Sequence, residues 1–270
     1  MTTHLLREKA PITEAGWEEL DTEARERLEP ALAVRKLIDF SGPHGWDYSA
    51  TNLGRVVSLD AFEGVGALRR RVLPTVELRA PFALARSELF DLERGADDID
   101  LGPLDEAARR IAYAENVAVF HGWAEAGIRG IAEACVHPAV ELTTDFDAFP
   151  RFVARAVETL LRAGIGGPYG LALGPEQYTG VIETTEHGGY PLLDHLHKIL
   201  ADGPIVWAPG VRGAAVVSLR GGDFLFESGQ DLSIGYVSHD ESAVQLYLEE
   251  SFTFRVATPE AACFLSPAAG

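Results

Sequence analysis

The sequence predicts an α+β protein, because two different periodicities each dominate a part of the chain. Apolar residues recur at steps of three or four in several segments before residue 162, which is typical of helices packed on one side. Apolar and polar residues alternate from Val244 through Leu248 to Val256, which is typical of a half-buried strand. A single strand over that stretch would span roughly 40 Å at about 3.3 Å per residue, and this length is unusual in a compact globule.

The first predicted element is a helix over residues 13–29. Thr13 is a favourable N-cap, and Ile12 with Trp17 matches a hydrophobic staple. The helix has a narrow apolar stripe opposite a strongly charged face, so we expect it to lie on another element. Pro30 then ends or kinks this helix.

The segment after this helix predicts a protruding arm. Residues 48–78 contain two strand-like runs joined by a turn at Gly64 to Gly66. Two strands of this length have no core of their own, so the arm must lean on another chain. Arg69, Arg70 and Arg71 lie in its second strand. They either contact acidic neighbours in other subunits or form an ordinary solvated basic patch.

Two helices are expected next. Ser87 is expected to cap a short helix through Arg94, which Gly95 ends. A longer helix is expected over residues 103–122, with Pro103 in its first turn. Its apolar stripe is mostly alanine, which favours close packing, and we assign it no chemistry.

Helices and strands alternate in the next part of the chain. A wide apolar face over residues 149–161 predicts a helix that is well buried on one side. A strand is expected at Tyr169 to Leu173, a helix from Pro175, and a further strand at Ile205 to Ala208.

The C-terminal region predicts further strands. Phe224 and Phe226 alternate with other residues, as do residues 232–236, and we expect these two runs to form a hairpin. Glu250 is the misfit, since its parity places it on the apolar face of the long strand. Either a bulge or a charged partner from another chain would explain it, and the bulge is favoured.

Composition limits the class of protein. The chain has 270 residues, 47% of them hydrophobic, and a net charge of −18. This acidic balance argues against nucleic acid as a partner, because phosphate binding needs Lys and Arg. No signal peptide or membrane-spanning run is apparent, so we expect no membrane contact and place the protein in the cytoplasm. Cys135 and Cys263 are expected to be reduced thiols.

The sequence contains no recognisable catalytic or metal-binding constellation. His195 and His197 would diverge by about 200° on a helix, so they are expected to be surface residues and no metal ligand is assigned. Neither a nucleophile elbow nor a phosphate-binding glycine loop is present. We therefore expect that the chain is not an enzyme and carries no cofactor.

Several ordered motifs resemble one known family. They are "APITEAGWEEL" at Ala10, "LGRV" at Leu53, "ELRAPFALARSELFDLERG" at Glu77, "GGPYGLALGPEQYT" at Gly166, and "RGGDF", "GQDLSIGY" and "YLEESFTFRV" after residue 219. Together they resemble the encapsulins, bacterial and archaeal proteins that self-assemble into nanocompartments. The resemblance covers nearly the whole chain.

The resemblance implies the fold of tailed-bacteriophage major capsid proteins of the Hong Kong phage type. Such a fold has a peripheral domain, an axial domain and an extended loop. The peripheral domain would comprise residues 1–47, 79–133 and 220–270, the extended loop residues 48–78, and the axial domain residues 134–219. The helices at 13–29 and 103–122 would be the inner-wall helix and the spine helix.

The resemblance also implies a function. Pentamers of the chain would close into an icosahedral shell of about sixty chains. The shell would sequester a cargo enzyme, a dye-decolourising peroxidase or a ferritin-like iron-oxidising protein, through the cargo's C-terminal targeting peptide. The alternatives are a phage or prophage capsid protein that encloses DNA and, from a different class, a stand-alone soluble enzyme.

Two sites follow from the same resemblance. The positions that match the cargo-peptide groove are Leu28, Leu32, Arg35, Ile38, Asp39 and Ile234. Arg35 and Asp39 would fix the peptide, or they would simply pair with each other across one helical turn. The positions that match the five-fold pore loop are Glu183, Thr184, Thr185, Glu186, His187, Gly188 and Gly189. Some relatives stack a flavin on an aromatic residue at the Ser87 position, and a serine offers no such ring.

Overall fold

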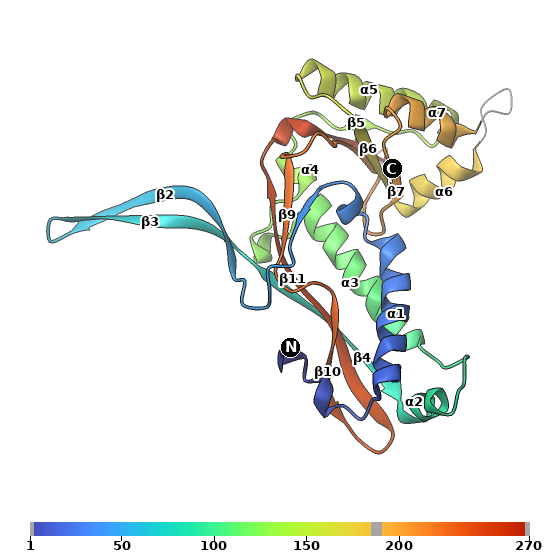
Figure 1. The fold of residues 1–270 in the computed structure, drawn as a ribbon. Coiled ribbons are helices and arrows are strands. Elements are labelled where there is room, and N and C mark those ends of the chain that lie inside the picture. The colour runs from blue at the N-terminus through green and yellow to red at the C-terminus, as the bar shows by residue number, and fades with distance from the viewer. Residues whose placement is uncertain (1–2, 185–190, 268–270) are drawn as a thin grey trace.

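The computed structural model describes residues 3–184 and 191–267, and its strands form two sheets and a separate two-stranded ribbon (Figure 1). The first sheet contains β1 (Asp39–Ser41), β4 (Val76–Ala85), β9 (Phe224–Ser228), β10 (Ser233–His239) and β11 (Ala243–Val256). The second contains β5 (Val140–Glu141), β6 (Tyr169–Leu173), β7 (Ile205–Trp207), β8 (Ala214–Ser218) and β12 (Ala262–Ser266). The ribbon consists of β2 (Ala50–Phe62) and β3 (Val65–Pro74).

Helices cover both sheets. They are α1 (Glu14–Ala31), α2 (Arg86–Glu93), α3 (Gly102–His121), α4 (Ile131–Ala134), α5 (Phe149–Arg162), α6 (Pro175–Glu183) and α7 (Leu192–Ile199). Short 3-10 turns are η1 (Thr3–Leu5), η2 (Arg7–Lys9), η3 (Val34–Lys36), η4 (Ala124–Ala126), η5 (Phe146–Ala148) and η6 (Pro259–Ala261). In the described ranges, none of the helices is both long and apolar enough to cross a membrane.

The long strand β11 organises the first sheet, as its alternation predicts. Strand β4 pairs antiparallel along one edge of β11 from Ala243 to Phe252. On the other edge, β10 and β9 follow one another, with β9 pairing from Phe252 to Val256. The expected hairpin between the 224–226 and 232–236 runs is therefore wrong, since β11 has 14 residues and is long enough to pair with both strands in turn.

The N-terminal helix begins as the sequence predicts. Thr13 is its N-cap and its hydroxyl accepts a hydrogen bond of 3.2 Å from the amide of Gly16. Pro30 lies within the last turn, and the helix ends at Ala31. Helix α1 packs beside α3, the predicted long helix of small residues (Figure 1).

The cap predicted for the short helix is wrong. Helix α2 begins at Arg86, and Ala85 is its N-cap without any side-chain hydrogen bond. Strand β4 ends directly before α2, at Ala85, so the turn from strand to helix falls two residues earlier than a Ser87 cap requires. Ser87 lies inside the first turn of the helix.

The second sheet has the strand order β5-β12-β8-β6-β7, and α5 packs on it. Its strand at Tyr169–Leu173 and the helix that begins at Pro175 confirm the predicted elements. Strand β12 lies between β5 and β8, although residues 220–270 were assigned to the peripheral domain. The domain boundaries as a whole stay a prediction.

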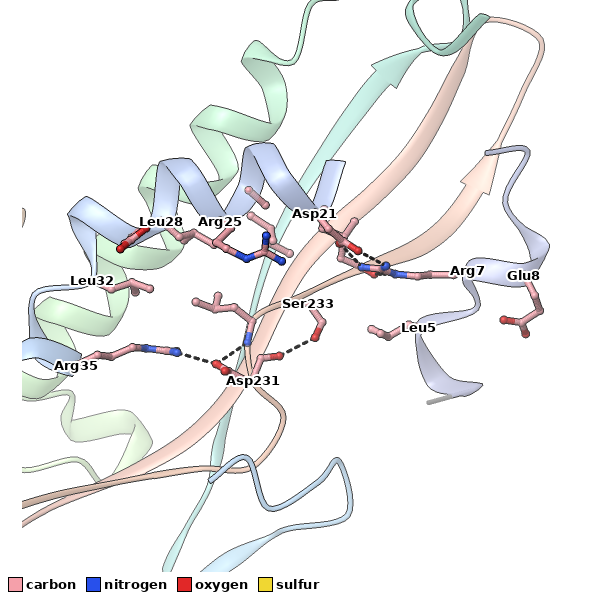
Figure 2. Close-up of a pocket in the computed structure, with 15 residues that line it drawn as sticks. Leu5, Arg7, Glu8, Asp21, Arg25, Leu28, Leu32, Arg35, Asp231 and Ser233 are labelled. Atoms are coloured by element: carbon pink, nitrogen blue, oxygen red, sulfur yellow. Dashed lines mark hydrogen bonds and ion pairs between the residues drawn. The ribbon is translucent and has the colours of Figure 1, made fainter. Parts of the chain in front are cut away.

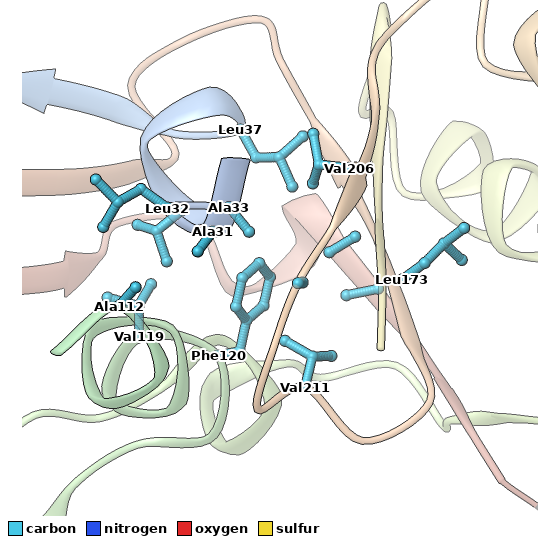
Figure 3. Close-up of a cluster of buried hydrophobic side chains, with 14 of the residues drawn as sticks. Ala31, Leu32, Ala33, Leu37, Ala112, Val119, Phe120, Leu173, Val206 and Val211 are labelled. Carbon is cyan, nitrogen blue, oxygen red and sulfur yellow. The ribbon is translucent and has the colours of Figure 1, made fainter. Parts of the chain in front are cut away.

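One continuous apolar core joins the two sheets. Figure 3 shows Phe120 of α3 between Leu32, at the end of α1, and Val211, near the second sheet. Phe120 is completely buried. The ribbon of β2 and β3 extends away from this body (Figure 1). Because both faces of the ribbon are exposed over most of its length, the two strands gain little from burial within the subunit.

Candidate functional site

A groove with a volume of about 1200 Å³ lies between α1 and β10. Helix α1 forms one wall, and β10 with the loop before it forms the other; the N-terminal turns η1 and η2 lie at one end (Figure 2). We call it the α1–β10 groove. Its lining residues are Leu5, Arg7, Glu8, Asp21, Ala24, Arg25, Leu28, Glu29, Leu32, Arg35, Asp231, Leu232, Ser233, Ile234 and Leu248.

The floor of the groove is apolar. Leu28 comes from the buried stripe of α1, Leu32 is the C-cap of that helix, and Ile234 and Leu248 come from paired positions of β10 and β11. Polar and charged side chains lie around this floor. Such a surface suits an extended segment with a few apolar side chains.

One end of the groove is closed by an ion pair of the N-terminal segment. Arg7 donates two hydrogen bonds of 2.7 Å each to the carboxylate of Asp21 on α1. Its Nε donates a third, of 2.8 Å, to the carbonyl oxygen of Ile234 on β10. Arg7 therefore connects the two walls of the groove (Figure 2).

Three carboxyl groups surround Arg35 at another part of the groove, and we call this set the Arg35 cluster. Arg35 donates to Glu115 of α3 at 2.9 Å, to Asp231 before β10 at 2.7 Å and to Glu250 of β11 at 2.9 Å. Glu115 and Glu250 are 0% and 1% exposed, whereas the Asp231 side chain is 41% exposed. Arg35 and Asp231 line the groove, while the two glutamates lie behind them.

Burial and charge act in opposite directions in the Arg35 cluster. Burial by itself lowers the pKa of Arg35, but the carboxylates of Glu115, Glu250 and Asp231 raise it above its usual value, so Arg35 is charged. Burial raises the pKa of Glu115 against the opposing effect of Arg35. The pKa of Glu250 is raised well above its usual value by burial and then by the charge of Glu115.

The cluster corrects the expectation for Glu250. The pairing of β11 with β4 runs without a shift through Glu250, so no bulge occurs there. The partner is Arg35 of the same chain rather than a residue of another chain. A buried guanidinium allows a carboxyl group on the apolar face of this strand.

Four of the six residues predicted for peptide binding line the α1–β10 groove, namely Leu28, Leu32, Arg35 and Ile234. Ile38 and Asp39 instead line a separate cavity of about 200 Å³. The helix expected to carry Arg35 and Asp39 is only the 3-10 turn η3, after which the chain enters β1. For the same reason the two do not pair; Asp39 accepts a hydrogen bond from the amide of Gly222.

The predicted pore loop is described only at its start. Glu183 is exposed at the end of α6, and the Thr184 hydroxyl donates to the carbonyl oxygen of Gly180 at 2.7 Å. The remaining predicted residues, Thr185, Glu186, His187, Gly188 and Gly189, lie outside the described residues.

Sequence reasoning missed several groove residues. Asp231, Leu232 and Ser233 belong to the motif "GQDLSIGY", so the motif itself could have pointed to them. Leu5 and Arg7 have no local pattern that marks them. Within the ranges that the structure describes, no group of three or more His, Cys, Asp or Glu side chains is arranged to hold a metal ion.

The fold defines the class of protein. The structure is similar to that of a virus-like particle from Pyrococcus furiosus, with a TM-score of 0.63 and 17% identity over 93% of this chain and 99% of that chain. It is also similar to the capsid of an empty GTA particle, with a TM-score of 0.54 and 15% identity over 88% of this chain and 90% of that one. A structure titled "Gordonia phage Cozz" has a TM-score of 0.53 and 14% identity over 88% of this chain and 87% of that chain. The chain therefore has the capsid fold of tailed phages.

Sequence comparison is more specific. A family model described as "Encapsulating protein for peroxidase" matches residues 1–253. The type 1 encapsulin shell protein of Rhodospirillum rubrum is 48% identical over 265 residues, which cover 96% of this chain and 94% of the relative. That of Mycobacterium tuberculosis is 42% identical over 264 residues, covering 97% and 99%. The chain belongs to the encapsulin family, and the resemblance found in its sequence is confirmed.

Proposed function

We propose that this chain is the subunit of a cytoplasmic encapsulin shell, in which pentamers close into an icosahedral particle of about sixty chains. The family and the capsid fold support assembly of many subunits into a shell. The ribbon of β2 and β3 supports it as well, because Phe62, Val65 and Leu68 are 76%, 67% and 64% exposed within one subunit. Contact with neighbouring subunits would remove these side chains from water.

The interior of the shell holds a cargo enzyme, which the α1–β10 groove binds through a C-terminal peptide of the cargo. The observation that carries this proposal is the groove itself, with its apolar floor between two rigid walls. An extended peptide with spaced apolar side chains would bury them there. The description of the family model supports a peroxidase as cargo, and a ferritin-like iron-oxidising protein is the second class.

Small substrates enter through pores in the shell. The loop that begins at Glu183 would surround the five-fold axis, so that symmetry repeats its Glu and His side chains around the opening. An acidic ring would favour small cations over anions, in keeping with the chain's net charge of −18. Catalysis belongs to the cargo rather than to this chain.

Electron microscopy of the purified recombinant protein tests the shell, and the expected result is hollow spherical particles. Small oligomers without a shell under native conditions would contradict the proposal. Particles that contain nucleic acid, with a high ratio of absorbance at about 260 to about 280 nm, would favour the DNA-enclosing alternative.

Mass spectrometry of particles purified from the native host tests the cargo. A peroxidase or ferritin-like protein is expected inside them. Deletion of its last residues should leave the shell intact and the cargo outside. Cargo that stays inside without its C-terminal peptide would contradict the role of the groove.

A further inference from the structure

The Arg35 cluster contains more carboxyl groups than its single guanidinium can neutralise. Glu115, Glu250 and Asp231 all accept hydrogen bonds from Arg35, each through one oxygen. Asp231 is partly exposed and also accepts a hydrogen bond of 2.9 Å from the amide of Leu232. Water and backbone therefore stabilise its charge, whereas Glu115 and Glu250 are inaccessible to solvent.

The two buried glutamates lack a hydrogen-bond donor for their remaining oxygen atoms. The Oε1 atoms of Glu115 and Glu250 are buried and have no hydrogen-bond partner while both groups are carboxylates. Both side chains accept from the same Arg35 guanidinium, Glu115 from Nε and Glu250 from Nη2, so their carboxyl groups lie side by side and a protonated one would hydrogen-bond to the other. Two carboxylates cannot do so, because neither has a hydrogen to donate. A single proton on one of them would supply the missing donor and remove one buried negative charge.

We propose that Glu115 and Glu250 share one proton at neutral pH, and that this proton keeps the Arg35 cluster closed behind the α1–β10 groove. The proposal goes beyond the proposed function, since it holds whether or not the groove binds a peptide. It concerns three elements that the cluster joins, namely α3, β11 and the η3 turn that carries Arg35.

The charged groups that face the pair are Arg35 and Asp231. On β11 the neighbouring Glu249 lies on the other face of the sheet, where its carboxylate pairs with His4 at 2.7 Å and with Arg79 at 3.2 Å. On β4 the residue opposite Glu250 is the apolar Leu78. From α1, Arg25 and Glu29 line the groove at exposed positions. Among the described groups named here, Arg35 is the cation that balances the charge of the pair.

Loss of the shared proton should lower the stability of the fold as the pH rises. A carboxyl group whose pKa is raised in the folded state stabilises the fold fully below its unfolded value, and this contribution disappears as the pH rises through the folded pKa. Burial and the Glu115 charge raise the pKa of Glu250. Alkaline pH therefore leaves two buried carboxylates against one guanidinium, and the cluster opens.

Infrared spectroscopy of the assembled full-length protein in D₂O detects the proton directly, through the C=O stretch of a protonated carboxyl group. The wild type is expected to show this band at neutral pH and to lose it at alkaline pH. Glu250→Gln should lack the band, because the amide donates to Glu115 in place of the acid. Glu249→Gln, a buried neighbour on the other face of the sheet, should keep it.

Thermal unfolding from about pH 5 to about pH 10 supplies the second measurement. The apparent melting temperature of the wild type should fall with pH by about 3–5 °C for each unit by which the pKa is raised. Glu250→Gln should show a much flatter profile. If that variant does not fold, Glu115→Gln and the wild-type band remain as tests.

Absence of the wild-type band at neutral pH, or equal pH profiles for the wild type and a folded Gln variant, would overturn the proposal. Particle formation and cargo content, measured on the same samples, separate this result from a failure of the proposed function.

Discussion

Arg35 and Glu250 are 215 positions apart in the chain, yet a guanidinium nitrogen of Arg35 donates to the Glu250 carboxylate at 2.9 Å. This contact fixes the 3-10 turn after α1 against the centre of the long strand β11. The contact also gives Arg35 a role within the subunit. The family resemblance suggests Arg35 only as a ligand for the cargo peptide. Because Arg35 donates to three carboxyl groups of the same chain, we expect it to stabilise the fold of the subunit.

Replacement of Arg35 by Ala is expected to lower the free energy of unfolding by about 3–5 kcal/mol, because the buried Glu115 and Glu250 lose the guanidinium that pairs with both. Urea unfolding of the dissociated subunit measures this change. The matched control is Arg27→Ala, which removes an exposed Arg that pairs with Glu23 and Asp105. That variant should lose less than about 1 kcal/mol. Equal losses in the two variants would contradict the structural role of Arg35.

Filling the groove should block cargo without affecting the shell. Ser233→Trp places an indole in the α1–β10 groove, and we expect cargo loading to fall at least about tenfold, which corresponds to about 1.4 kcal/mol. Ser238→Trp is the control, since Ser238 is an exposed residue of the same strand and does not line the groove. Loading is measured by co-purification of the cargo with intact particles. Unchanged loading with Ser233→Trp would remove the groove from the binding site.

The exposed ribbon predicts a variant whose subunits fold normally but form less stable shells. Leu68→Asp changes a side chain that is 64% exposed on β3, so the subunit should keep its circular dichroism spectrum. Shells should dissociate at lower urea concentration, because the ribbon has no other core to enter. Leu161→Asp changes a Leu that is 57% exposed on α5 and serves as the control. Native gels report the assembled fraction, and equally stable shells in both variants would contradict the assembly role.

The N-terminal segment should loosen when its link across the groove is cut. Arg7→Ala removes the hydrogen bonds to Asp21 and to the Ile234 carbonyl. Hydrogen exchange of residues 4–10 is expected to accelerate by about tenfold, while the amides of α3 keep their protection. Arg7→Lys should give an intermediate rate, since lysine keeps the charge but loses the bidentate geometry. No change in exchange would show that this segment is held by other contacts.

The cysteines should react slowly while the protein is folded. Burial raises the pKa of the Cys263 thiol to about 11, so only about one molecule in a thousand carries the thiolate at pH 8. Burial also raises the pKa of Cys135, which is partly exposed. A thiol reagent should therefore modify Cys135 first and both residues rapidly in urea. Fast modification of Cys263 in the folded protein would contradict its burial.

Local patterns predicted the individual elements well. The N-cap at Thr13, the strand at Tyr169–Leu173 and the unbroken strand through Val256 all depend on neighbouring residues, and each is confirmed. One failure, the predicted hairpin, depends on contacts between distant segments. The 224–226 and 232–236 runs both lie beside β11 instead of pairing with each other. No local pattern reveals this, because the choice depends on the length of a third strand.

The same distinction applies to the candidate site. Leu28, Leu32 and Ile234 belong to amphipathic elements, so their apolar sides were predictable, and all three line the groove. The partners of Arg35 lie 80, 196 and 215 positions away, beyond any local periodicity. Ile38 and Asp39 line a separate cavity, because the chain forms a 3-10 turn there and then a strand instead of a helix.

The place of β12 has a consequence for the order of events during translation. This strand lies between β5 and β8, and its residues follow every other described strand in the chain. A nascent polypeptide therefore lacks an internal strand of its second sheet until residues 262–266 have left the ribosome. Before that point a subunit should be unable to present a finished second sheet to another subunit.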